Sequence, residues 1–314
     1  MQEPIFLESV FQEKIWGGRQ MADYFGYAIP SDQTGEFWAI SAHPNGPSIL
    51  KNGPYAGKTL AEVYSQAPEL FGYPAEPVFP LLTKIIDSSD WLSVQVHPDD
   101  RYAMAHEGEL GKTECWYILD AAEGAEIIYG QSAANREELS EKIAVGDWDG
   151  FLERVSVKKG DFFYVPSGTV HAIGPGIILL ETQQSSDTTY RIYDFDRVDD
   201  QGQARDLHIQ QSLDVVTYGP VANSKPQTLQ VDALTSTLLV TNDYFTVYKW
   251  EVAGPLEMTR TAPYLLISVI DGTGQLEVAG RSYPLQKGEH FILPHTVTDW
   301  RLEGQMTLIA SHTS

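Results

Sequence analysis

Short apolar segments, bounded by Gly, Pro, Asn or Asp, recur along most of the chain. Such segments are typical of β-strands, in which side chains i and i+2 lie on the same face. Helical periodicity predicts short helices only over residues 59–72, 135–147 and 205–216. The pattern therefore predicts a mainly β protein with a few short helices.

One pattern of strands and turns occurs twice. Residues 157–173 (VKKGDFFYVPSGTVHAI) resemble residues 285–302 (LQKGEHFILPHTVTDWRL), since both have Lys-Gly-acid, an apolar strand and a proline six residues after the glycine. A strand, a turn and a strand precede each copy. Two antiparallel β-sandwiches would produce this repeat. We therefore expect domains over residues 1–218 and 229–314, joined by a polar, proline-containing linker.

Four polar residues of the first half stand out against their apolar surroundings. In LSVQVHPDD (92–100), Gln95 and His97 are two residues apart and so share a strand face. Glu114 begins the strand ECWYIL, and His171 follows the turn in VPSGTVH. Imidazole and carboxylate groups are ordinary Zn²⁺ ligands, but buried histidines are also common hydrogen-bonded core residues. Spacing alone leaves both interpretations open.

The second copy lacks these candidate ligands. When the copies are aligned on Pro166 and Pro294, His171 falls opposite Asp299. When they are aligned on Asp120 and Asp271, Glu114 falls opposite Leu265. We therefore expect any metal chemistry in the first half only.

The composition of the chain restricts its possible binding partners and its location. A formal charge of −22 argues against binding to nucleic acid or to an anionic membrane surface. No apolar run is long enough to span a bilayer, and no signal peptide is apparent. The single cysteine, Cys115, rules out an intrachain disulfide and fits a reducing, cytoplasmic location. The sequence does not determine the oligomeric state.

Several motifs, in order, resemble type I mannose-6-phosphate isomerases of the shorter bacterial form. They are KIWGG (14–18), GEFWAISAHPNG (35–46), LSVQVHPDD, GKTECWYIL, VPSGTVHAIG and ETQQSSDTTYRIYDFDR. The resemblance covers essentially the whole chain. It implies a double cupin fold, one Zn²⁺ in the N-terminal cupin, and interconversion of mannose 6-phosphate and fructose 6-phosphate.

The resemblance also implies roles for individual residues. The implied zinc ligands are Gln95, His97, Glu114 and His171. The implied catalytic residues are Arg191, Lys112 and Asp187, and the implied substrate-binding residues are Ser93, Lys84, Lys112 and Arg191. The chain departs from longer members in having Lys-Thr-Glu where they have Lys-Pro-Glu, and in the segment that follows Arg191.

Aldose–ketose isomerisation moves a proton between C2 and C1 through a cis-enediol, so negative charge on the sugar oxygens must be stabilised. Arg191 is always protonated and suits that role. The sequence does not identify the general base that transfers this proton. Two alternatives stay open: another metal-dependent cupin enzyme, such as an Fe-dependent oxygenase, and a non-catalytic sugar-binding cupin. His208, in the third predicted helix, is expected to be inert.

Overall fold

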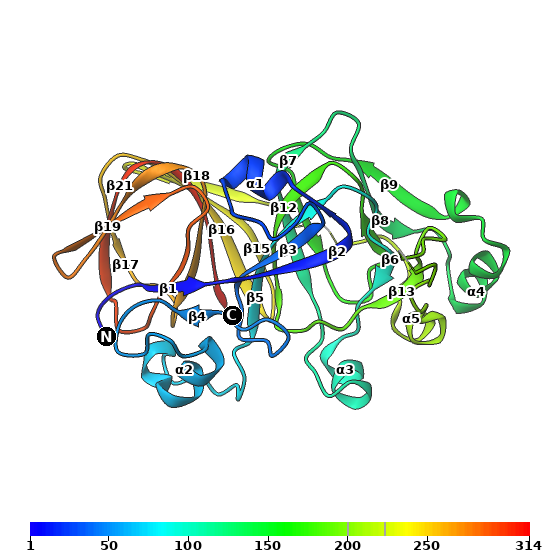
Figure 1. Ribbon diagram of the computed structural model, residues 1–314, viewed down its shortest axis with the longest axis horizontal. Helices are drawn as coiled ribbons and strands as arrows, with labels where there is room; N and C mark the ends of the chain where they lie inside the picture. The colour runs from blue at the N-terminus through cyan, green and yellow to red at the C-terminus, as the bar shows by residue number, and fades with distance from the viewer. Residues whose placement is uncertain (200, 223) are drawn as a thin grey trace.

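The computed structural model describes residues 1–199, 201–222 and 224–314. The protein is mainly β and has two halves, each built from antiparallel strands (Figure 1). Cyan and green strands form one half, and yellow to red strands form the other. In the part of the chain that the structure describes, no helix is long and apolar enough to cross a membrane.

The N-terminal half contains two sheets. In spatial order, the larger sheet consists of β10 (Phe162–Val165), β7 (Glu114–Ala121), β12 (Ile177–Gln184), β5 (Leu81–Ser88), β2 (Val10–Gly18) and β3 (Thr34–Ile40). The smaller sheet consists of β13 (Tyr190–Tyr193), β6 (Val94–Val96), β11 (His171–Ile173), β8 (Glu126–Gln131) and β9 (Leu152–Ser156). Apolar side chains of both sheets, such as Trp116 and Ile127, pack together in one core. The two sheets therefore form a sandwich.

Strand β7 illustrates how alternation divides the chain between two cores. Trp116 and Ile118 face the interior of the first sandwich, whereas Cys115 and Leu119 belong to a core shared with the C-terminal half. Side chains alternate between the faces of a strand, so Glu114 shares the inner face with Trp116. The buried Cys115 lies on the opposite face and packs in the core shared with the second half.

The C-terminal half is one large sheet that folds over its own core. Its main order is β14 (Gln227–Val231), β15 (Leu234–Thr241), β16 (Phe245–Ala253), β21 (Asp299–Thr313), β18 (Leu265–Val278), β20 (His290–Leu293), β1 (Ile5–Glu8) and β4 (Ile49–Leu50). In addition, β17 (Leu256–Thr259) pairs with β21, and β19 (Arg281–Gln286) pairs with β18. The first strand of the chain thus belongs to the sheet of the second half.

The domain division at residues 219–228 stays a prediction. Part of that linker, residue 223, lies outside the described residues, and β14 begins at Gln227. The pairing of β1 with β20 ties the N-terminal segment to the second half.

The helices are short and lie at the periphery. They are α1 (Gln20–Phe25), α2 (Leu60–Gln66), α3 (Asp100–His106), α4 (Arg136–Val145) and α5 (Ile209–Val215), with 3₁₀ turns η1 (Pro68–Phe71) and η2 (Trp148–Gly150). A capping box at Thr59 starts α2, and the Asn135 side chain caps α4, as their sequences predict. The sequence pattern missed α1 and α3.

The third predicted helix begins four residues later than expected. The His208 backbone N–H donates to the Arg191 carbonyl at 2.7 Å, and the Arg191 N–H donates to His208 Nδ1 at 3.2 Å. Pairing with β13 therefore holds His208 outside helical geometry, and α5 starts at Ile209. The prediction of helix over residues 205–208 is wrong.

Strand pairing confirms the internal repeat. In the first half Val165 pairs with Glu114, and in the second half Leu293 pairs with Leu265. Val165 and Leu293 are equivalent in the alignment on the two prolines, and Glu114 and Leu265 are equivalent in the alignment on Asp120 and Asp271, so the copies share one register.

His290 is a buried histidine of the second half. Its Nδ1 lies 2.8 Å from Ser268 Oγ, and its Nε2 lies 3.0 Å from the Tyr27 hydroxyl. Burial lowers the pKa of His290 to about 3. The folded protein therefore holds this imidazole neutral under conditions in which an unfolded chain would protonate it.

This difference predicts a specific loss of stability in acid. Below pH ~6.5 His290 becomes protonated in the unfolded chain but stays neutral in the folded chain. The free energy of unfolding therefore falls as the pH drops towards the folded pKa. We expect the wild type to lose roughly 2 kcal/mol more than His290→Asn between pH 6.5 and 4.5. Urea unfolding of both proteins at the two pH values measures this. Equal pH dependence would contradict the assignment.

Candidate active site and metal centre

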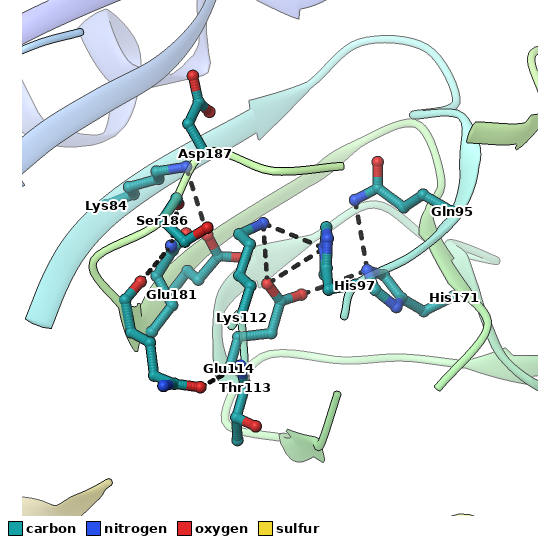
Figure 2. A network of polar contacts seen from close by, with 12 residues as sticks. Lys84, Gln95, His97, Lys112, Thr113, Glu114, His171, Glu181, Ser186 and Asp187 are labelled. Carbon is teal, nitrogen blue, oxygen red and sulfur yellow. Dashed lines mark hydrogen bonds and ion pairs between the residues drawn. The ribbon is translucent and has the colours of Figure 1, made fainter. Parts of the chain in front are cut away.

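Three predicted ligands converge inside the first sandwich. His97 follows β6, Glu114 begins β7 and His171 begins β11. His97 Nε2 lies 3.5 Å from Glu114 Oε2, and His171 Nε2 lies 3.3 Å from Glu114 Oε1 (Figure 2). All three residues are buried, and their potential ligand atoms lie within 4.8 Å of one another.

Backbone carbonyls orient both imidazoles. His97 Nδ1 lies 2.9 Å from the Thr188 carbonyl oxygen, and His171 Nδ1 lies 2.9 Å from the Thr169 carbonyl oxygen. A carbonyl can only accept, so each Nδ1 carries the hydrogen and each Nε2 presents a lone pair towards Glu114. Metal-binding histidines characteristically have this outer hydrogen bond.

The sequence VPSGTVH explains the local geometry. The Thr169 N–H donates to the Pro166 carbonyl, and Gly168 has φ of 86°, which is the positive value that a type II turn requires. The Gly168 N–H donates to the His97 carbonyl oxygen at 2.8 Å. One tight turn thus connects the backbone positions of His97 and His171.

Burial keeps both imidazoles neutral. Burial, reinforced by Lys112 and His171, holds the pKa of His97 well below its ordinary value. Burial also lowers the pKa of His171 to about 4, even though its bond to Thr169 favours the charged form. Neutral imidazole is the state that binds a metal ion.

The Glu114 carboxylate is the strongest indication of a bound cation. Glu114 is 1% exposed, and within the described residues its carboxylate has no polar side-chain contact apart from the two imidazoles and the Lys112 ammonium. The Lys112 ammonium lies 3.0 Å from Glu114 Oε2 and 3.1 Å from His97 Nε2. The carboxylate and the lone pair of His97 therefore already contact a positive group, and the lone pair of His171 lies 3.3 Å from the same carboxylate. This donor set fits a divalent metal ion.

Gln95 lies beside these three residues. It pairs with His171 across the sheet, and its amide nitrogen lies 3.3 Å from His171 Nε2. Its oxygen lies 3.3 Å from Ser93 Oγ, which donates to it. A half-turn of the amide would exchange these two contacts and turn the oxygen, the expected ligand atom, towards His171.

Lysines and acids surround the predicted ligands in a buried network. Lys84 Nζ lies 3.7 Å from Glu36 and 3.8 Å from Glu181, and it stacks 4.7 Å from the centre of the Trp38 ring. Lys14 lies 3.5 Å from Glu36. The network pairs positive and negative groups, as burial of charge requires.

The network shifts the pKa values of its two acids, Glu36 and Glu181, in opposite directions. Burial raises the pKa of Glu36, but Lys84, Lys14 and the Trp38 indole outweigh it and bring the pKa to about 2. Burial, followed by repulsion from Glu114, raises the pKa of Glu181 to about 7. Burial alone would lower the pKa of Lys112, but the neighbouring carboxylates Glu114 and Glu181 raise it. Lys112 is therefore a charged donor here.

A cavity of about 290 Å³ opens onto this cluster. The predicted residues in its lining are Ser93, Lys84, Gln95, Lys112, Asp187 and Arg191. Because Gln95 and Lys112 contact both the cavity and the histidines, they connect the two parts of the site. The structure therefore brings all the predicted site residues into one region.

Arg191 and Asp187 enter the cavity with different partners. Arg191 Nε donates to the Asp206 carbonyl oxygen at 2.9 Å, and Asp187 accepts a hydrogen bond from Asn45 at 3.0 Å. Figure 2 shows the Asp187 carboxylate directed away from the histidines. Burial and then Arg205 lower the pKa of Arg191.

Sequence reasoning missed five ionisable residues of the lining. Glu36 and Glu181 lie in the GEFW and ETQQ motifs, and Lys14 begins KIWGG, so each could have been examined as a site residue. Arg205 and His208 come from the segment predicted as a helix. No local pattern distinguishes these last two, because their approach to the site depends on pairing with β13.

Comparisons with known proteins agree with this geometry. Residues 5–120 match the family model "Phosphomannose isomerase type I, catalytic domain", and residues 235–313 match "Mannose-6-phosphate isomerase, cupin domain". The chain is 59% identical over its full length to mannose-6-phosphate isomerase from Streptococcus mutans, covering 99% of that protein.

Solved structures agree as well. Mannose 6-phosphate isomerase from Bacillus subtilis is 51% identical, with a TM-score of 0.97 over 99% of this chain and all of that one. A variant of phosphomannose isomerase from Salmonella typhimurium, only 15% identical, shares the fold with a TM-score of 0.80 over 99% of each chain. The predicted mainly β, cupin-containing fold is confirmed. The chain belongs to the type I mannose-6-phosphate isomerase family.

Proposed function

We propose that this protein is a zinc-dependent enzyme that interconverts mannose 6-phosphate and fructose 6-phosphate through a cis-enediol. The observation that carries the proposal is the buried Glu114 carboxylate, which lies beside two histidine lone pairs below a cavity lined with Lys and Arg. The names of relatives that are 50% identical or more support the choice of substrate.

His97, Glu114, His171 and Gln95 would hold the zinc ion. When bound, zinc would act as a Lewis acid that stabilises negative charge on the sugar oxygens. Lys112 would have to release His97 and Glu114 to the metal, because its ammonium contacts both in this structure. Its charge would then be available to the substrate in the adjoining cavity.

The charged side chains of the cavity can carry the remaining steps. Arg191 and Lys112 would stabilise the enediolate electrostatically. Glu181 and Asp187 are carboxyl groups of the lining that could move the proton between C1 and C2. Glu181 is the better placed, since it lies 3.8 Å from Lys84 and burial raises its pKa, which suits a group that must both take up and release a proton. The Lys84 ammonium is already engaged by two acids, which leaves it less free to bind phosphate.

Three further points stay proposals. The protein acts on a small sugar phosphate and has no nucleic-acid or membrane partner, in keeping with its charge of −22. The buried, unpaired Cys115 fits a cytoplasmic location. The two halves form a catalytic and a non-catalytic cupin.

Replacing one ligand tests the proposed metal centre. We expect His97→Ala to lose bound zinc and to reduce kcat for mannose 6-phosphate by at least ~10³-fold, because it removes a lone pair that the centre needs. His312→Ala is the control, because that imidazole lies in the last strand of the second half, where it approaches its neighbour's carbonyl and the Tyr248 ring. Metal analysis and a coupled isomerase assay measure both effects. Full activity of His97→Ala would refute the proposal.

Glu109 supports the metal centre from outside. Its Oε2 accepts hydrogen bonds from Ser186 Oγ at 3.2 Å, the Asp187 N–H at 3.3 Å and Thr188 Oγ1 at 3.0 Å. The carbonyl of Thr188 in turn accepts from His97. Glu109 therefore fixes the loop that orients a ligand.

Removing this anchor should weaken metal binding without removing a ligand. We expect Glu109→Ala to lower zinc affinity about 10- to 100-fold, the usual cost of losing an outer hydrogen-bond partner. Competition with a chromophoric chelator measures this independently of activity. The control is Glu123→Ala, at an exposed turn. Equal affinities for the two variants would show that Glu109 does not position His97.

A further inference from the structure

A row of side chains runs across the smaller sheet, away from the predicted metal ligands. His171 pairs with Gln95, and Gln95 pairs with Arg191 in the next strand. Residues directly paired across strands point to the same face, so all three face the cavity side. Adjacent strands lie roughly 4.8 Å apart, which places the Arg191 position about 10 Å from the His171 position.

The row continues beyond the last strand through His208. This residue exchanges two hydrogen bonds with the backbone of Arg191, one from its N–H and one to its Nδ1. Because Nδ1 accepts, Nε2 carries the hydrogen and is a donor. Burial and then Arg191 lower the pKa of His208, so the imidazole is neutral and donates from Nε2 alone.

Arg205 lies at the same end of the cavity. Its Nε donates to Asp194 at 2.8 Å and its Nη2 donates to Asp194 at 2.6 Å, which holds the guanidinium rigidly and leaves the Nη1 edge uncommitted in the described residues. Arg191 similarly uses only Nε for the Asp206 carbonyl. Two guanidinium edges and one imidazole N–H thus line one end of the cavity.

This end has more positive than negative charge. Asp194 is shared between Arg205 and Arg197, since both donate to its Oδ1. Arg197 also pairs with Asp90 at 3.1 Å, so two carboxylates face Arg197 and Arg205. Arg191 adds a third positive charge without a carboxylate ion pair among the described residues. The uncompensated Arg191 favours an anion at this end, and planar guanidinium groups match a phosphate geometrically.

We propose that Arg205 and His208, together with Arg191, form the subsite for the phosphoryl group of the hexose 6-phosphate. The inference rests on the proposed isomerase function and adds residues to it. A six-carbon sugar would span the row, with C1 and C2 near Gln95 and His171 and its phosphate at the far end. The segment after Arg191, where the sequence departs from longer family members, thereby acquires a function in this chain.

Phosphate binding to variants tests the subsite. Titration of inorganic phosphate into the holoenzyme, followed by calorimetry, should show Arg205→Gln and His208→Asn binding it about 10- to 100-fold more weakly than wild type. The Asn oxygen can replace Nδ1 as acceptor for Arg191 but cannot supply the Nε2 donor. His208→Gln, whose amide can reach the Nε2 position, should restore part of the affinity.

Arg197→Gln is the matched control. Arg197 also binds Asp194, but it is not part of the cavity lining. If Arg205 acted only by holding Asp194, the two variants would behave alike, and this result would overturn the proposal. Unchanged phosphate affinity in both Arg205→Gln and His208→Asn would overturn it as well.

Kinetics separate this proposal from the proposed function. With mannose 6-phosphate, Arg205→Gln should raise KM about 10- to 100-fold with a smaller effect on kcat. An inactive wild type with intact phosphate binding would reject the isomerase function but not the anion subsite. An active wild type whose Arg205→Gln variant keeps its KM would reject the subsite alone.

Discussion

The buried carboxylate of Glu114 is the constraint on which the site depends. A carboxylate in a protein interior is costly unless a cation compensates for it. Two imidazoles, each oriented by a backbone carbonyl, direct lone pairs towards this carboxylate, and the Lys112 ammonium contacts the carboxylate and His97. The surrounding strands, the tight turn at Gly168 and the loop anchored by Glu109 all serve to hold this arrangement.

The second half shows that the same frame can exist without the chemistry. Its strands repeat the register of the first half, but Leu265 replaces the glutamate. The strand pair Gln95 and His171 of the first half corresponds to Thr259 and Asp299 in the second half. There Thr259 Oγ1 donates a hydrogen bond to Asp299. Apolar side chains such as Trp300 and Leu302 fill its interior. The fold therefore supplies strand positions, and the polar side chains at those positions decide whether a metal can bind.

Strand alternation predicted a large part of the site from sequence. The i, i+2 spacing of Gln95 and His97 in LSVQVHPDD places one side chain beside His171 and the other beside Glu114, because strand periodicity is a local property. Glu181 and Arg205 could not be found in this way, because their approach depends on pairing between distant segments. The helix expected over residues 205–208 failed for the same reason: backbone bonds to Arg191 outweigh the local preference.

The most direct test of the central claim is removal and replacement of the metal. Chelated protein, reconstituted anaerobically with Zn²⁺ or Fe²⁺, should regain mannose 6-phosphate isomerase activity with one equivalent of Zn²⁺ per chain and without O₂. The recovered activity should follow the zinc content of the sample. Full activity in metal-free protein, or turnover that requires Fe²⁺ and O₂, would contradict the account of Glu114 as a ligand in a zinc isomerase.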